Sequence, residues 1–142
     1  MARPTPRELG KLPTNDEMRL LIVEDRPKEL VEWAEKVGEH LAACKLTTNQ
    51  IRNVFGTVRQ IEMNWRSDPD ASYRQAVLLM PKLGYAAARE RGKGMGDLET
   101  VLLPGLTAIK DTTNPAQRSE RFMRFAEFFE AILAYHRKYG GN

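Results

Sequence analysis

The side chains best suited to covalent chemistry in this sequence are those of His40 and the single cysteine, Cys44. They are four residues apart in a stretch with helical periodicity, so they are neighbours on one helix face. A thiol beside an imidazole is the beginning of a nucleophilic site, because the imidazole accepts the thiol proton. The sequence offers no obvious third residue to orient the imidazole, and both positions adjoin the apolar stripe of the helix. We therefore interpret the pair as packing residues.

A second candidate is the group of glycines around Lys93, which has the composition of a phosphate-binding loop. A P-loop requires glycine five residues before its Gly-Lys pair and Ser or Thr after the lysine. Ala87 and Gly94 stand at those positions. No strand is predicted before the loop, and no HExxH or clustered Cys/His pattern indicates zinc. The sequence therefore predicts a protein that is not an enzyme, with no catalytic residue, metal or cofactor.

Positive charge is concentrated in the middle third of the chain, although the 142 residues together have a formal net charge of only +3. Residues 1–43 hold seven Lys and Arg against nine Asp and Glu, residues 44–96 nine against four, and residues 97–142 six against six. The net charges of these segments are −2, +5 and 0. Such a basic segment indicates a negatively charged partner, either a nucleic-acid backbone or an acidic protein surface.

Two groups of cations in the basic segment are spaced to follow a polyanion. Arg52, Arg59 and Arg66 are seven residues apart, so on a helix they run along one edge at intervals of about 10 Å. Lys82 and Arg89 share a face of the next predicted helix. Cations in such rows contact phosphates without reading the base sequence.

Both groups also have a plainer interpretation. Surface helices carry arginines for solubility, and Glu62 is placed to neutralise Arg59 or Arg66. Tyr85 shares the face of the second group and suits either stacking on a base or half-buried packing. Spacing alone therefore leaves nucleic-acid binding and docking on a protein both open.

The elements that must position these residues are predicted to form an all-α, compact bundle of about five helices. Apolar residues at intervals of three and four predict helices, and the predicted ranges are 26–45, 46–65, about 72–92, 92–111 and 115–139. The fourth range is expected to be a glycine-rich loop and a helical segment broken near Pro104-Gly105. Thr47 with Gln50 forms a capping box, and Asn114 before Pro115 marks the start of the last helix.

Two of the predicted helices have features that bear on how the helices pack together. In the third helix Pro81 removes a backbone donor and is expected to introduce a kink. The face of that helix expected to pack inwards consists of Tyr73, Ala76, Val77, Met80, Gly84 and Ala87. The last helix is Phe-rich and apolar around most of its girth, so it is predicted to be the central helix of the bundle.

The N-terminal part of the chain is interpreted separately. Residues 1–16 are polar and proline-rich, and we expect a poorly ordered arm followed by one domain over residues 17–142. The stretch RLLIVED, residues 19–25, is similar to the first strand of a receiver domain, but the alternating strands that such a fold needs are not predicted downstream. No stretch approaches the roughly 20 apolar residues of a membrane span, and a cytoplasmic location is expected.

Three motifs then follow one another in a familiar order: LTTNQIRNVF from Leu46, LLMPKLGYAAAR from Leu78 and RFAEFFEAILAYHRKYGG from Arg124. Together they resemble the small subunit of type III-A CRISPR–Cas effector complexes, the Csm complexes. The acidic PKELVEWAEKVGEHL is similar to the first helix of that family. The resemblance covers about residues 26–141. Arg137 stands where the family usually has lysine, which keeps the charge.

The resemblance implies a non-catalytic subunit present in several stacked copies along the filament of the complex. Such subunits line the channel that holds the guide RNA and the target RNA, and they contact the backbone and large subunits. The basic positions of the family correspond to Arg52, Lys82 and Arg89. The charge pattern adds Arg59, Arg91, Lys93, Arg66 and Lys45 as RNA-binding candidates. The alternative is a helical scaffold whose basic middle docks on an acidic partner without contacting RNA.

Overall fold

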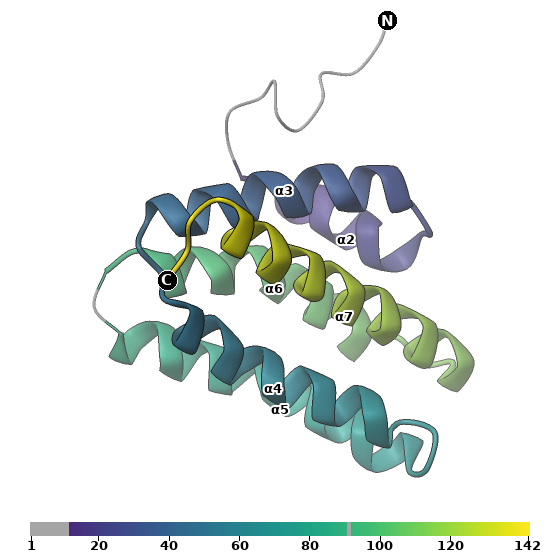
Figure 1. Ribbon diagram of the computed structural model, residues 1–142. Helices are drawn as coiled ribbons and strands as arrows, with labels where there is room; N and C mark the ends of the chain where they lie inside the picture. The colour runs from purple at the N-terminus through teal and green to yellow at the C-terminus, as the bar shows by residue number, and fades with distance from the viewer. Residues whose placement is uncertain (1–11, 91) are drawn as a thin grey trace, which may run out of the picture.

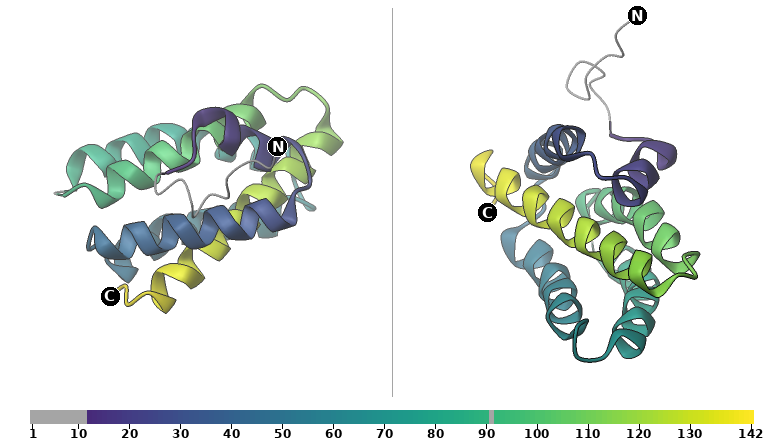
Figure 2. Two further views of the ribbon diagram at one scale, coloured as in Figure 1. Left: turned by 90° about the horizontal axis from the view of Figure 1, so that it is seen from above. Right: turned by 90° about the vertical axis from the view of Figure 1, so that its right-hand side faces the viewer.

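The computed structural model describes residues 12–90 and 92–142, which form six α-helices and no strand. The helices are α2 (Asn15–Val23), α3 (Pro27–Ala43), α4 (Thr48–Asn64), α5 (Pro69–Arg89), α6 (Gly94–Lys110) and α7 (Pro115–Lys138). They lie in pairs, with α6 and α7 between α2 and α3 on one side and α4 and α5 on the other (Figures 1 and 2). The all-α class is confirmed for these residues, with six helices in place of about five.

Helix α7 occupies the centre of the bundle, as its apolar girth predicts, and contacts each of the other five helices. Its fully buried residues include Phe122, Phe125, Phe128, Phe129 and Ile132. Trp65 of α4 stacks on Phe122 with 4.9 Å between ring centroids, and Phe55 lies 5.3 Å from Phe129. Burial of one such side chain contributes about 1.5–3 kcal/mol, so α7 organises much of the core.

The predicted helix starts are confirmed by their hydrogen bonds. The Thr47 hydroxyl accepts from the backbone N–H of Gln50, and the Gln50 side chain accepts from the N–H of Thr47. The Asn114 side chain accepts from the N–H of Gln117, with Pro115 in the first turn. These bonds satisfy backbone donors that a helix start otherwise leaves unpaired.

Helix α2 was missed by the sequence analysis, which expected an arm up to residue 16 and weighed a strand over residues 19–25. Its capping box is formed by Thr14 and Glu17, so the local signal for a helix start was present. Leu21 and Ile22 are buried, and Arg124 of α7 donates to the carbonyls of Ile22 and Val23. Nine residues make a helix that is marginal alone, and packing on α6 and α7 stabilises it. The rest of the expected arm, residues 1–11, lies outside the described residues.

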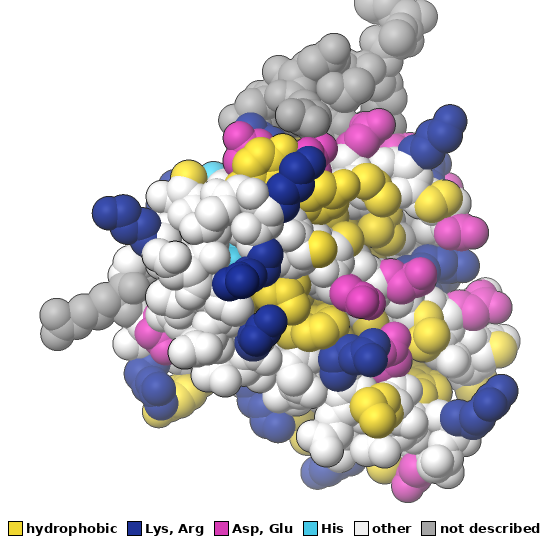
Figure 3. All heavy atoms as spheres, in the orientation of Figure 1, with side chains coloured by type: hydrophobic (Ala, Val, Ile, Leu, Met, Phe, Trp, Pro, Cys, Tyr) yellow, Lys and Arg dark blue, Asp and Glu magenta, His cyan; other side chains and the backbone are white. Residues whose placement is uncertain are grey.

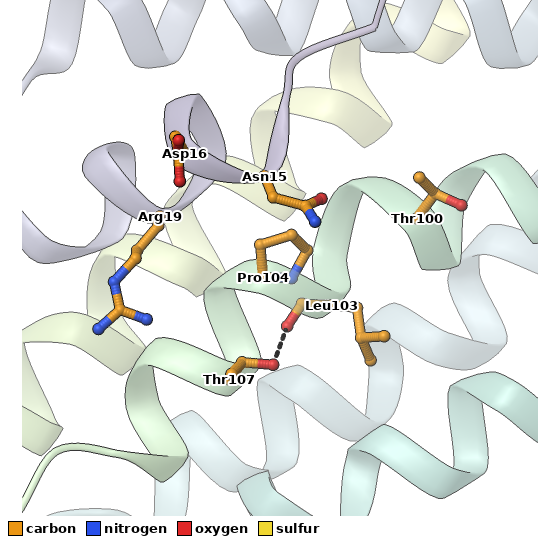
Figure 4. Close-up of a pocket in the computed structure, with 7 residues that line it drawn as sticks. All are labelled: Asn15, Asp16, Arg19, Thr100, Leu103, Pro104 and Thr107. Atoms are coloured by element: carbon orange, nitrogen blue, oxygen red, sulfur yellow. Dashed lines mark hydrogen bonds between the residues drawn. The ribbon is translucent and has the colours of Figure 1, made fainter.

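The expected break near Pro104-Gly105 is wrong, because α6 is continuous from Gly94 to Lys110. Pro104 removes only one backbone donor, and it lies on the α2 side of the helix, in the pocket of Figure 4. Gly105 is buried where neighbouring helices approach closely. A Cβ at this position would lie 3.0 Å from Ile22 Cγ1 and 3.2 Å from Phe125 Cδ1. The Pro-Gly pair therefore serves packing and does not end the helix.

Helix α5 differs from its prediction in both its ends and its inner face. It starts at Pro69, where the Asp68 side chain caps it, and ends at Arg89. Its buried residues are Ser72, Ala76, Leu79 and Leu83, so only Ala76 of the predicted inner face is fully buried. The face is rotated because α5 packs against α4 on one flank and α6 on the other. Pro81 is exposed and lies within the helix.

Candidate nucleic-acid interface

Exposed cations gather at the end of the bundle where α3, α5 and α7 finish and α4 and α6 begin, at the left in Figure 1. We call this the basic end; among the described residues its exposed cations include Lys45, Arg52, Arg89, Lys93, Arg137 and Lys138. In Figure 3, Lys and Arg side chains outnumber acidic ones on this side of the face shown, whereas the two kinds are mixed elsewhere. The basic end thus joins cations from segments far apart in the chain.

Polar and close contacts between the helix ends hold the basic end together. The Gln50 side chain donates to the Glu90 carboxylate at 2.9 Å, which ties α4 to α5. The buried His136 ring shares a hydrogen bond with the Leu46 carbonyl at 2.5 Å, and Arg137 donates to the Thr48 hydroxyl. Such directional bonds fix the geometry of the helix ends.

The turn after α3 presents Lys45 in an unusual backbone conformation. Its φ is +64°, in the left-handed region that glycine usually occupies. Lys45 N–H donates to the Ala42 carbonyl, and Leu46 N–H donates to the Leu41 carbonyl. This is the Schellman pattern of helix ends. Leu46 is buried next to the start of α6, since a Cβ at Gly94 would lie 2.9 Å from the Leu46 Cβ.

Lys82 and Arg89 line two adjacent hollows between α4 and α5, with volumes of about 180 and 190 Å³. Asn53 and Val54 of α4 line both hollows, so they form one shallow groove. Tyr85 lies on its rim and is 66% exposed, so the half-buried packing weighed for this ring is wrong. The Arg89 guanidinium is 5.9 Å from the centre of the Tyr85 ring. The groove therefore offers two cations and an aromatic ring on one helix.

The row of arginines on α4 does not line this groove. Arg52, Arg59 and Arg66 are all exposed; Arg52 and Arg59 lie on the side of α4 away from Asn53 and Val54, and Arg66 lies in the turn after the end of α4. Arg59 is paired with Glu62 at 3.1 Å. Among the described residues, Arg52 has no such ion pair. The structure therefore separates the two groups of cations that the sequence analysis considered together.

The remaining candidates have different surroundings. Lys93 precedes the first turn of α6, and its side chain is 75% exposed with Nζ 3.8 Å from Asp97 Oδ2. The glycines after it belong to α6, so the expected glycine-rich loop is shorter than predicted. Arg91 lies outside the described residues. Arg137 was not among the predicted candidates, although its place in a helix C-terminus three residues before Gly140 was visible in the sequence.

The His40–Cys44 pair has a third partner that the sequence analysis did not find. Asp97 Oδ2 lies 2.7 Å from His40 Nε2, and Cys44 Sγ lies 3.4 Å from the same nitrogen. In a catalytic triad the carboxylate and the nucleophile contact different ring nitrogens, so this geometry is not that of a triad. Burial and the Asp97 carboxylate raise the pKa of the Cys44 thiol, which disfavours the thiolate nucleophile.

Two larger hollows of the described surface lie away from the basic groove. One of about 420 Å³ lies between α2 and α6 and is lined by Asn15, Asp16 and Arg19 of α2 and by Pro104 of α6, with the Asn15 side chain beside Pro104 (Figure 4). In it the Thr107 hydroxyl donates to the Leu103 carbonyl of its own helix. The other, of about 400 Å³, lies between the start of α3 and α7. Neither is lined by histidine or cysteine.

The fold and the site together define an all-α bundle with exposed cations gathered at one end. The family model described as Csm2 Type III-A matches residues 24–142, from the end of α2 to the C-terminus. The chain belongs to this family, that of the small subunits of type III-A CRISPR complexes. Comparison with curated proteins and with solved structures gave no match. Among the described residues, no helix has the length and hydropathy to cross a membrane.

Proposed function

We propose that this protein is a non-catalytic subunit that binds the backbone of the guide RNA and target RNA and helps to assemble the filament of a type III-A effector complex in the cytoplasm. Family membership supports a place in such a complex. The observation that carries the RNA contact is the convergence of exposed cations from the ends of five helices at the basic end. Base pairing reads sequence in RNA-guided complexes, so the protein needs to contact only backbone and shape.

The contact surface in this proposal runs from the basic end along the α4–α5 groove. Arg89 belongs to both, and Lys82 lies seven residues before it, about 10 Å along α5. Tyr85 stacks on a base or ribose beside these cations. Each copy contacts only a few phosphates, and stacked copies make a continuous basic track. Arg52, Lys45 and Lys93 extend the track at the end of the bundle, whereas Arg59 and Arg66 contribute least because they lie further from it.

The test is RNA binding by the isolated protein over a series of salt concentrations. The test variant is Arg52→Ala/Lys82→Ala/Arg89→Ala, and the matched control is Arg19→Ala/Lys28→Ala/Lys110→Ala, which removes the same charge from exposed positions elsewhere. Each phosphate contact with single-stranded RNA contributes roughly 0.7 to the slope of log affinity against log salt. Four contacts give a slope of about −3, and removal of three should flatten it by about 2.

The expected result is a flattened slope for the test variant and an unchanged slope for the control, with RNAs of unrelated sequence. Equal losses in both variants would show that net charge alone is responsible, and would overturn the assignment of these residues. Lack of binding by the wild-type protein at low salt would favour the docking of the basic segment on a protein.

A second candidate function, docking on an acidic partner protein, is favoured by one observation. The outer face of α5 exposes Leu78 and Tyr85, which are 40% and 66% exposed, beside its cations. Apolar and aromatic side chains next to arginine are typical of protein interfaces. A Leu78→Ser/Tyr85→Ser variant distinguishes the two functions: loss of association with the other subunits and intact RNA binding would support docking through this face.

A further inference from the structure

Three side chains with metal-binding atoms converge where the end of α3 meets the start of α6. His40 lies in the last turn of α3, Cys44 caps that helix, and Asp97 lies in the first turn of α6. The distances are 2.7 Å from His40 Nε2 to Asp97 Oδ2, 3.4 Å from His40 Nε2 to Cys44 Sγ, and 3.9 Å from Cys44 Sγ to Asp97 Oδ2. The His40 Nε2, Cys44 Sγ and Asp97 Oδ2 atoms thus surround a common centre.

This triangle has nearly the dimensions of one face of a tetrahedral zinc site. Zinc bonds of about 2.0–2.3 Å place neighbouring ligand atoms about 3.3–3.8 Å apart. Of the two distances to sulfur, the one from His40 Nε2 (3.4 Å) lies within this range and the one from Asp97 Oδ2 (3.9 Å) lies just above it. The distance between His40 and Asp97 is shorter because the pair shares a hydrogen bond, which a metal ion would replace. The three ligand atoms lie within 4.8 Å of one another.

We propose that His40, Cys44 and Asp97 form a Zn²⁺-binding site that joins α3 to α6. One imidazole nitrogen, one thiolate and one carboxylate oxygen make a donor set of intermediate softness, which suits zinc better than magnesium or calcium. Three protein ligands leave a fourth position for water. Binding displaces the proton of the Cys44 thiol to solvent, and the imidazole coordinates through Nε2 as a neutral ring.

The surroundings of the three ligands leave room for an ion. The side chains of His40 and Asp97 are 29% and 15% exposed, so the site is accessible from solvent yet partly enclosed. Lys93 is the nearest competing cation, with Nζ 3.8 Å from Asp97 Oδ2. Because its side chain is 75% exposed, it turns to solvent at little cost when a divalent ion binds.

The consequence for the fold is an added link between two helices that approach each other at few residues, α3 and α6. A zinc ion therefore fixes the start of α6, and with it Lys93, relative to the turn at Lys45. The zinc site does not depend on the proposed RNA contact, because its three ligands are not among the proposed RNA-binding residues and its test measures metal binding alone.

The experiment uses untagged full-length protein and titrates Co²⁺ as a spectroscopic substitute for Zn²⁺. Because the chain contains one cysteine, any thiolate-to-cobalt charge-transfer band must arise from Cys44. We expect one ion per chain, a charge-transfer band that Cys44→Ser abolishes, and displacement of cobalt by zinc. Competition with a chromophoric chelator gives the Zn²⁺ affinity of Asp97→Asn, which should fall at least about tenfold. Asp111→Asn, at the other end of α6, is the control and should bind zinc like the wild type.

Folding is checked by circular dichroism, and Asp97→Asn keeps the size of the side chain if Cys44→Ser fails to fold. Zinc should raise the melting temperature of the wild type and of Asp111→Asn, and not that of Asp97→Asn. Absence of a charge-transfer band, or equal zinc affinity in the two aspartate variants, would overturn the proposal. In that case the His40–Asp97 contact is only a hydrogen bond between two helices.

Discussion

Two parts of α7 pack against their neighbours in different ways; we call residues 115–129 the aromatic half and residues 130–138 the second half. In the aromatic half, Phe122 contacts Trp65, which caps α4, and Phe129 contacts Phe55 of α4, both ring to ring. The second half approaches the backbone of α3 closely: a Cβ at Gly38 of α3 would lie 2.6 Å from Tyr135 Cβ and 2.8 Å from the backbone nitrogen of His136. The second half also forms polar links, such as that between His136 and Leu46.

The difference shows that one part of α7 mainly stabilises the bundle and the other part mainly fixes its geometry. Apolar burial is strong but non-directional, so the aromatic half stabilises the bundle without fixing the helix ends. Hydrogen bonds and close backbone approach are directional and leave little freedom. They lie at the basic end, where they fix the positions of the exposed cations. Three predictions test this division, from the largest expected effect to the smallest.

Phe125→Ala tests the aromatic half. Phe125 is fully buried, and its ring centroid is 5.8 Å from that of Phe122 and 6.4 Å from that of Phe129. Truncation removes apolar contacts and leaves a cavity, so the free energy of unfolding should fall by about 3–5 kcal/mol. Urea denaturation followed by circular dichroism measures this. Met123→Ala on the same helix is 44% exposed in the wild type and should change stability by no more than about 0.5 kcal/mol. Similar losses in both would contradict the central role of the ring cluster.

Gly38→Ala tests the close approach of α3 and α7. The added methyl group would meet backbone atoms of α7, with the Ile132 oxygen at 2.9 Å, so the helices must separate. We expect a loss of about 1–3 kcal/mol from overpacking. Gly56→Ala is a matched control in the interior of α4, because no atom lies within 4 Å of a Cβ there. It should raise stability by about 1 kcal/mol through helix propensity. If both substitutions stabilise the protein, the helices are not held at this distance.

Lys45→Gly tests the turn at the basic end. The left-handed conformation of Lys45 costs roughly 1–2 kcal/mol for a residue with a Cβ, and part of the gain from glycine is lost to the freer unfolded chain. Stability should therefore rise by about 0.5–1 kcal/mol. Lys45→Ala keeps the Cβ and should bring no such gain. Both variants lose the same cation and should weaken RNA binding equally, so a difference between their RNA affinities would assign the effect to the turn and not to the charge.

The sequence alone determined most of the helices and the central place of α7. These predictions succeeded because their signals are local: the capping box at Thr47, the cap at Asn114 and the repeat of phenylalanines all depend on residues three or four positions apart. The missed helix α2 also had a local signal, Thr14 with Glu17, which was outweighed by the prolines before it. The error at Pro104 shows the limit of prediction from neighbouring residues alone. Helix α6 continues through this proline because it is packed against other helices there.

Tertiary structure alone decided which residues meet. Asp97 lies 57 residues from His40 in the chain, and no local pattern relates the two. The basic end likewise joins Lys45, Arg89 and Lys93 through the ends of three different helices, and the buried face of α5 follows from its two neighbours. These features depend on long-range packing. The apolar periodicity of a single helix is compatible with several rotations of that helix about its own axis. Only the contacts between the helices select one rotation, and with it the side chains that share a site.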